Sequence, residues 1–170
     1  MNQASNVGIG LFGFGNIGAG VIRTLADNKD IIARNLGFGL DLRRVVDIDI
    51  TTSRGVAVDP ALLSTDRNDI LNDPEISIVI ELIGGAGIAK TLVEASLNAG
   101  KHIVTANKEL IAKHGPVLHA LAAKNGVKLL FEASVGGGIP VITPLLTCLR
   151  ANKMDRVLGI VNGTTNYILT

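Results

Sequence analysis

The sequence predicts an α/β protein in which a doubly wound parallel β-sheet is covered by helices on both faces. Short segments rich in valine and isoleucine alternate with longer segments whose apolar residues recur at helical spacing. This alternation is typical of strand–helix–strand units. Hydrophobic residues make up 47% of the 170 residues and charged residues only 18%. Such a balance is expected when a parallel sheet is buried on both faces.

The first half of the chain is predicted to begin with an apolar strand at residues 7–12. A helical pattern follows a glycine-rich corner as far as about residue 26. A second helix spans 29–36 and ends at Gly37, because glycine suits the position after a helix. The later elements are a strand at 42–46, an irregular stretch at 51–64, a short helix at 66–71 and an almost continuously apolar strand at 76–80.

The second half continues the alternation. Gly100 and Asn125-Gly126 are expected to end helices, and Pro140 suits the first turn of another. The predicted order is a helix at 88–98, a strand at 102–105, a helix at 116–124, a strand at 127–131, a helix at 140–151 and a strand at 156–161. Right-handed crossovers join such strands into one parallel sheet.

Charge and composition exclude several other classes of protein. The net charge is +1 and the basic residues are scattered, so no surface for nucleic acid or acidic membranes is expected. No apolar run is long enough to cross a bilayer, and the N-terminus lacks an export signal. A single cysteine, Cys148, cannot form an internal disulfide and is expected in the core. We therefore expect a cytoplasmic protein that binds neither nucleic acid nor a membrane.

The chemistry of the chain centres on the corner Gly13-Phe14-Gly15-Asn16-Ile17-Gly18. The pattern G-x-G-x-x-G also fits residues 8–13, but only the later register follows a strand pattern and precedes a helical one. There Gly13 permits the tight turn, Gly15 leaves room for a pyrophosphate, and Gly18 lets the helix approach the strand. A glycine turn without a ligand is the alternative. The flanking elements favour the dinucleotide site of a Rossmann-type fold.

An acidic residue follows the second predicted strand. In Rossmann-type folds a carboxylate at this point accepts hydrogen bonds from the adenosine ribose and repels a 2′-phosphate. Asp47 is the first candidate and Asp49 the second, with ordinary solvated carboxylates as the alternative. The spacing from the glycines exceeds the usual ~20 residues because a second helix and a turn intervene. Asp47 predicts NAD as the preferred cofactor, whereas three basic residues keep NADP as an alternative: Arg43, Arg44 and Arg54.

Five segments, in order, resemble the homoserine dehydrogenase family and together cover nearly the whole chain. They are 13–18 (GFGNIG), 81–85 (ELIGG), 100–110 (GKHIVTANKEL), 131–140 (FEASVGGGIP) and 159–170 (GIVNGTTNYILT). The resemblance implies an oxidoreductase that reversibly reduces aspartate 4-semialdehyde to homoserine with NAD(P), in threonine, methionine and isoleucine biosynthesis. The alternatives are a non-catalytic NAD(H)-binding or sensing module, or a relative such as dihydrodipicolinate reductase or aspartate dehydrogenase.

The resemblance also implies roles for particular residues. Asn16 and Ile17 would hold the cofactor pyrophosphate, and Lys108 would face both cofactor and substrate. Hydride transfer to an aldehyde leaves an alkoxide, which an ammonium can stabilise or protonate. A surface lysine without a catalytic role is the alternative. The nicotinamide side of the cleft would be lined by Ile83, Gly84, Thr105, Ala106 and Gly163.

The stretch at 131–140 resembles the monovalent-cation loop of the family. The carbonyl oxygens of Glu132, Val135, Gly137 and Ile139 would surround sodium or a similar hard ion, because hard cations take oxygen ligands. Such an ion would be structural. A simple glycine turn before a helix is the alternative. The three histidines, His102, His114 and His119, match no metal-ligand spacing.

Two departures from the family matter. Many members carry a basic residue after the second strand, whereas this chain has Asp47-Ile48-Asp49, which argues against NADP. The family also continues beyond Thr170, into the part that pairs two subunits and holds the substrate. We therefore expect residues 1–150 to form the NAD(P)-binding domain and 151–170 to begin a substrate and dimerisation domain. The full-length protein is expected to be a homodimer, and this chain alone to bind cofactor with little turnover.

Overall fold

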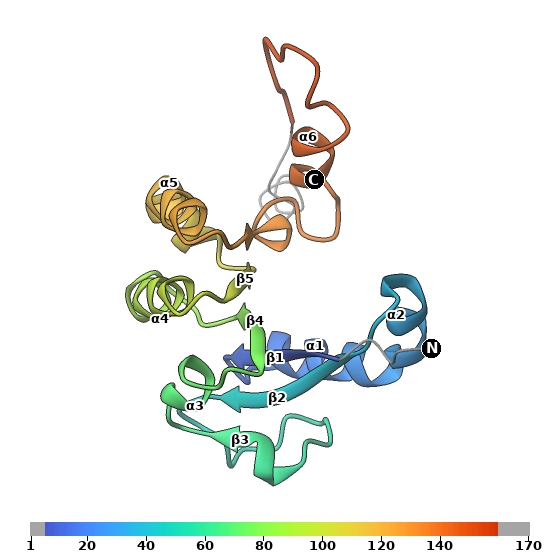
Figure 1. Cartoon of the computed structure of the whole chain (residues 1–170), viewed down its shortest axis with the longest axis vertical. Helices are drawn as coiled ribbons and strands as arrows, with labels where there is room; N and C mark the ends of the chain where they lie inside the picture. The colour runs from blue at the N-terminus through green and yellow to red at the C-terminus, as the bar shows by residue number, and fades with distance from the viewer. Residues whose placement is uncertain (1–5, 160–170) are drawn as a thin grey trace, which may run out of the picture.

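The computed structural model describes residues 6–159. Six strands within this range form one parallel sheet in the order β3-β2-β1-β4-β5-β6 (Figure 1). The strands are β1 (Val7–Phe12), β2 (Leu40–Val46), β3 (Leu63–Ser64), β4 (Ile76–Glu81), β5 (His102–Thr105) and β6 (Leu129–Leu130). β1 pairs with β2 on one side and with β4 on the other. The strand order therefore reverses at β1, where open α/β sheets bind ligands. The predicted Rossmann-type fold is confirmed.

Helices cover both faces of the sheet. They are α1 (Asn16–Asp27), α2 (Lys29–Leu36), α3 (Asn68–Leu71), α4 (Gly87–Asn98), α5 (Lys108–Lys124) and α6 (Ile142–Leu146), with two short 3₁₀ segments, η1 (Pro60–Leu62) and η2 (Glu132–Ser134). Figure 1 shows α1 and α2 on one side of the strands and α4 and α5 on the other. Within residues 6–159, no helix combines the length and the apolar character needed to cross a bilayer.

Two apolar clusters hold the sheet between these helices. Successive strand residues point to opposite faces, so the strands contribute to both clusters. Val79 and Ile103 pack with Leu118 in the cluster that includes α4 and α5, whereas Leu11 packs with Ile22 of α1 on the other side. Burial of one such side chain contributes about 1.5–3 kcal/mol. The two clusters therefore fix the strands in the register that aligns their carboxyl ends.

Helix α5 is longer than predicted. It begins at Lys108 rather than at residue 116, because the Asn107 side chain accepts a hydrogen bond from the N–H of Leu110 (3.0 Å) and caps the first turn. Pro116 consequently lies inside the helix, where it provides no N–H for the helical hydrogen bonds. Leu110 and Leu118 are fully buried and anchor the helix on either side of the proline.

Other boundary predictions are also wrong. Residues 63–64 form β3 within the predicted irregular stretch, because they pair with the end of β2. Helix α6 is shorter than predicted, since the Glu132 carboxylate accepts backbone N–H groups at its start. Residues 156–159 are irregular rather than a strand, as no described strand pairs with them; residues 160–161 lie outside the described part. Cys148 is exposed rather than in the core, because α6 ends before it.

Candidate functional site

The glycine corner joins β1 to α1 at the carboxyl end of the central strand. Gly13 has a φ of 103°, which favours glycine, and its N–H donates to the carbonyl of Val46 (2.9 Å). A Cβ on Gly18 would lie 2.1 Å from the Gly13 carbonyl oxygen, so the helix can begin this close only at a glycine. A Cβ on Gly15 would meet no atom within 4 Å. The space beside Gly15 is therefore open.

The first turn of α1 faces this open space without a side-chain cap. Asn16 and Ile17, its first two residues, are exposed. Amide groups in the first turn of a helix have no partners within the helix, and the helix dipole gives this end a partial positive charge. The corner can therefore accept an anion such as a pyrophosphate.

Asp47 lies beside the corner. Its carboxylate accepts the N–H of Phe14 (2.5 Å) on one oxygen and the N–H of Asp49 (2.9 Å) on the other. Each carboxylate oxygen can accept more than one hydrogen bond, so both keep capacity for a ligand hydroxyl. The tertiary structure thus brings together the glycine corner and the acidic residue that the sequence places after β2.

Asp49, the second candidate, is used within its own loop. Its carboxylate accepts the N–H groups of Thr51 (3.1 Å) and Thr52 (3.0 Å) and pairs with Arg54 (2.9 Å). Hydrogen bonds from Thr52 and then Thr51 hold the pKa of Asp49 well below its usual range. Arg54 is therefore already paired with a carboxylate.

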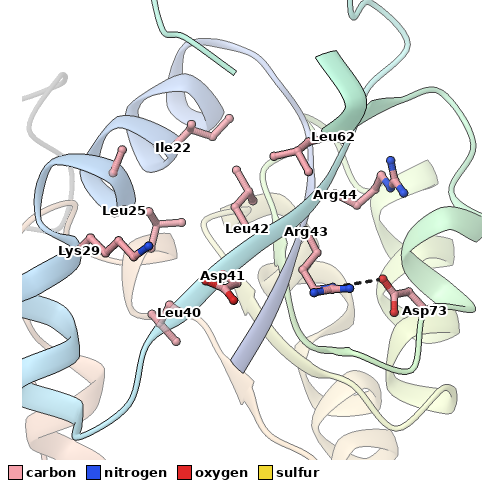
Figure 2. A pocket seen from close by; sticks show the side chains of 11 residues that line it. Ile22, Leu25, Lys29, Leu40, Asp41, Leu42, Arg43, Arg44, Leu62 and Asp73 are labelled. Atoms are coloured by element: carbon pink, nitrogen blue, oxygen red, sulfur yellow. Dashed lines mark ion pairs between the residues drawn. The ribbon is translucent and has the colours of Figure 1, made fainter. Parts of the chain in front are cut away.

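The other two arginines lie away from the corner, around a cavity of about 660 Å³ beside β2. Arg43 and Asp73 both line this cavity and form an ion pair at 3.6 Å, which is drawn as a dashed line in Figure 2. Arg43 also pairs with Glu75, just before β4, which places its guanidinium at the amino end of the sheet. Arg44 donates to the carbonyl of Ala61 (2.7 Å). Neither arginine is available to a ligand at the carboxyl end.

Two smaller cavities border the corner at the carboxyl end. One, of about 310 Å³, is lined by Asp47, by apolar residues that include Phe12 and Ile83, and by the polar run Thr65, Asp66 and Arg67. The other, of about 230 Å³, is lined by Ile17, Leu82, Ile83, Gly84, Gly85, Ala106, Asn107, Lys108 and Glu109. Ile83 lines both cavities, so they lie next to each other along the carboxyl edge. This arrangement suits an elongated ligand that places one half in each cavity.

Thr105 does not line the smaller cavity. It is buried, and its hydroxyl lies 2.5 Å from Glu81, a fully buried carboxyl group at the end of β4. Burial raises the pKa of Glu81, while hydrogen bonds from Thr105 and the N–H of Ile83 oppose that change. Sequence reasoning missed Glu81; the signal was a charged residue directly after the apolar run 76–80.

Lys108 is the first residue of α5 and is exposed at the smaller cavity. It forms no ion pair with any residue in the described range 6–159. By contrast, Lys113 on the same helix pairs with Glu109 at 2.6 Å. An ammonium group without a partner at a cavity can interact with a polar or negatively charged group of a ligand.

The loop at 131–140 is closed by Glu132. Its carboxylate accepts the N–H groups of Val141 (2.5 Å) and Thr143 (2.6 Å), and hydrogen bonds from Thr143 and Val141 lower the pKa of Glu132 to about 2. Gly136 and Gly137 have φ values of 73° and 61° and turn the chain sharply. Within residues 6–159, no group of three or more His, Cys, Asp or Glu side chains is placed to hold a metal.

Comparison with known proteins identifies the family. The family model "Homoserine dehydrogenase, NAD binding domain" matches residues 13–132, and the model "Homoserine dehydrogenase" matches residues 140–170. The chain belongs to the homoserine dehydrogenase family. Its nucleotide-binding region covers every cavity-lining residue described above at the carboxyl end except Phe12, which directly precedes it.

Relatives of the chain carry the same family name. Homoserine dehydrogenase of Bacillus subtilis is 40% identical over 95% of this chain, and that of Corynebacterium glutamicum is 43% identical over 97%. The crystal structure of a homoserine dehydrogenase from Thiobacillus denitrificans superposes with a TM-score of 0.91 at 40% identity, over 98% of this chain and 39% of that one. The chain spans about 37% of the length of the two curated relatives.

The structure thus groups most of the residues that the sequence predicts for the site. The glycine corner, Asp47, Ile83, Gly84, Ala106 and Lys108 lie together along the carboxyl edge of the sheet. The loop at 131–140 adjoins this edge, because the hydroxyl of Ser134 donates to the carbonyl of Thr105 (3.1 Å). Gly163 lies outside the described residues.

Proposed function

We propose that this chain is the cofactor-binding part of an enzyme that reversibly reduces aspartate 4-semialdehyde to homoserine with a nicotinamide cofactor. The observation that carries this proposal is the open helix N-terminus at Gly15, at the switch point of the sheet. One cavity is lined by Ile17 of this helix turn and another by Asp47, which accepts the N–H of Phe14 in the corner. Family membership supports the substrate class. The related reductases considered above share the fold type but not the family assignment.

The cofactor would lie along the carboxyl edge of the sheet. The amides of Asn16, Ile17 and Gly18 would bind the pyrophosphate, since the side-chain-free space at Gly15 lets it approach the backbone. The adenosine would occupy the cavity of about 310 Å³, with its ribose hydroxyls on Asp47. The nicotinamide would occupy the cavity of about 230 Å³, against Ile83, Gly84 and Ala106.

NAD is the preferred cofactor in this proposal. The Asp47 carboxylate accepts hydrogen bonds from ribose hydroxyls and repels a 2′-phosphate. Arg43 and Arg44 are held elsewhere, and Arg54 is paired with Asp49, so these three offer no free guanidinium for that phosphate. Arg67 also lines the adenosine cavity and forms no ion pair within residues 6–159, so it is the arginine through which NADP could still bind.

Lys108 is proposed as the catalytic residue of this part of the enzyme. The bound nicotinamide supplies the hydride. The ammonium of Lys108, at the mouth of the same cavity, would stabilise or protonate the oxygen of the aldehyde as negative charge develops on it. The carboxylates that would hold the substrate amine are assigned to the remainder of the full-length protein, which we propose to be a homodimer.

The loop at 131–140 is proposed to hold a structural monovalent cation such as sodium. The ligands would be the carbonyl oxygens of Glu132, Val135, Gly137 and Ile139. Two consecutive left-handed glycines support this role, because they let carbonyl groups turn toward one point.

Titration of the chain with NADH and NADPH tests the central proposal. NADH should bind, NADPH should bind about tenfold more weakly, and the chain alone should oxidise homoserine feebly or not at all. Absence of NADH binding would contradict the cofactor role. Robust turnover by the 170-residue chain would contradict the assignment of substrate-binding groups to the rest of the protein.

A further inference from the structure

The carboxyl ends of β4 and β5 are joined by hydrogen bonds between side chains. Glu81, the last residue of β4, is fully buried and accepts the N–H of Ile83 (2.7 Å) on Oε1. Its Oε2 lies 2.5 Å from the hydroxyl of Thr105, the last residue of β5. The same hydroxyl accepts the N–H of Asn107 (3.0 Å).

Asn107 closes these hydrogen bonds into a ring. Its Nδ2 donates to the carbonyls of Ile83 (2.9 Å) and Gly85 (2.7 Å), while its Oδ1 caps α5. Two sets of hydrogen bonds therefore join the loop after β4 to the loop after β5: those of Glu81 and Thr105, which are buried, and those of Asn107, which is half-buried. These loops and the first turn of α5 supply every residue that lines the cavity of about 230 Å³ except Ile17.

The donors and acceptors of the ring match a carboxylate at position 81. The Thr105 hydroxyl accepts from Asn107, so its single proton can be donated to Glu81. The other carboxylate oxygen takes the N–H of Ile83. An amide at position 81 has only one acceptor oxygen for these two donors. If that oxygen accepts from Thr105, the NH2 group faces the N–H of Ile83; if it accepts from Ile83, the hydroxyl proton loses its buried acceptor.

We propose that Glu81, Thr105 and Asn107 are positioning residues that set the separation of the two loops around the nicotinamide. The inference rests on the proposed binding of NAD(H). The adenosine cavity shares only Ile83 with the ring, and its other lining residues, which include Asp47, lie outside the ring. Breaking the ring should therefore weaken binding of the nicotinamide half of the cofactor more than binding of the adenosine half.

The test compares two ligands, NADH and ADP-ribose, which carries the adenosine and pyrophosphate but no nicotinamide. The variants are Glu81→Gln, Thr105→Val and Asn107→Ser; serine still caps a helix but is too short to reach both carbonyls. Each variant should raise the Kd for NADH about tenfold and change the Kd for ADP-ribose less than about twofold. Thr105→Ser, which keeps the hydroxyl, should restore tight NADH binding.

NADH binding can be followed by its own fluorescence, because the chain contains no tryptophan. Equal losses for NADH and ADP-ribose would overturn the proposal, since the ring would then only support the fold. Unchanged NADH affinity in all three variants would overturn it as well. Thermal unfolding identifies any variant that does not fold. Asn107→Ser keeps the test available in that case, because Asn107 is only half-buried whereas Glu81 and Thr105 are buried. If the wild-type chain binds neither NADH nor ADP-ribose, the proposed cofactor-binding function is contradicted. That result differs from a loss of NADH affinity in the variants alone, which tests only the ring.

Discussion

The two ends of the sheet differ in how their charged groups are used. At the amino end, beside the cavity of about 660 Å³, Arg43 pairs with Asp73 and Glu75, and the buried Lys101 ammonium donates to two backbone carbonyls at 2.7 Å each. Lys29 at the rim of that cavity is exposed and forms no ion pair among the described residues. At the carboxyl end the cavities are smaller. There the first amides of α1 face open space, and Lys108 has no ion pair among the described residues.

This difference shows that cavity volume does not locate the site in this molecule. Charged groups that already have partners gain little from a ligand, because binding would first have to break their existing hydrogen bonds. Unpaired donors at a helix end gain from an anion without such a cost. The carboxyl end is therefore the candidate site despite its smaller cavities.

Removal of the Lys108 ammonium group should have the largest effect on the proposed site, and the quantity affected is kcat. In the full-length protein, Lys108→Ala should lower kcat about 100-fold or more, because proton transfer and alkoxide stabilisation are lost, while the Kd for NADH changes less than about threefold. Steady-state kinetics and NADH titration separate the two quantities. Lys113→Ala, on the same helix but paired with Glu109, is the control and should leave kcat near wild type. An unchanged kcat in Lys108→Ala would make Lys108 a scaffold residue.

A side chain placed in the open space beside Gly15 should have the next largest effect, and the quantity affected is the Kd for NADH. Gly15→Val places a side chain where the pyrophosphate would lie and should raise the Kd for NADH about 30-fold or more. Gly20→Val is the matched control, since a Cβ there also meets no atom within 4 Å, yet it lies further along α1. Calorimetric titration should find near-normal NADH binding in the control. Equal losses in both variants would point to damage to α1 rather than to the site.

Changing the charge beside the corner should alter cofactor preference. Asp47→Asn keeps an oxygen that can accept the N–H of Phe14 but removes the negative charge. The ratio of the Kd for NADPH to the Kd for NADH should fall about tenfold, as repulsion of the 2′-phosphate disappears. Competition between the two cofactors measures this ratio. If it stays constant, Asp47 serves the corner structurally and has no role at the ribose.

A variant at the amino end should affect stability without affecting binding. Lys101→Met removes the donor to the carbonyls of Asp73 and Ile76 and should lower the free energy of unfolding by about 1–3 kcal/mol. NADH affinity of the folded variant should stay within about twofold of wild type. Urea unfolding and NADH titration give both values. A large loss of NADH affinity would show that the amino end of the sheet also contributes to cofactor binding.

The smallest expected effect concerns the loop at 131–140 and depends on pH. The folded-state pKa of Glu132 is about 2, below the unfolded value of about 4.3, so its carboxylate stabilises the fold above pH ~4.3 and loses that contribution as the pH falls toward 2. Glu132→Gln should therefore be less stable than wild type at pH 7, and the difference should narrow by pH 3. Urea midpoints at the two pH values test this. A difference that is constant with pH would exclude the charge as its cause.

Several parts of the site could be predicted because their signals are local. The glycine corner needs only six consecutive residues between a strand pattern and a helical one. Asp47 needs only its place after a strand. By contrast, the start of α5 was missed because Pro116 resembles a helix beginning, whereas the Asn107 cap and the buried Leu110 decide the boundary.

By itself, the sequence determined the parallel α/β fold, the glycine corner between the first strand and the first helix, and the likeness to one enzyme family, since alternating periodicity and short glycine motifs are properties of adjacent residues. Only the tertiary structure decided which charged groups are free. Arg43 meets Glu75 and Glu81 meets Thr105 across more than twenty residues of chain, through strand pairing that no local pattern encodes. The same pairing occupies the arginines near β2, leaves Lys108 exposed at a cavity, and closes the Glu81–Thr105–Asn107 ring beside that cavity of about 230 Å³.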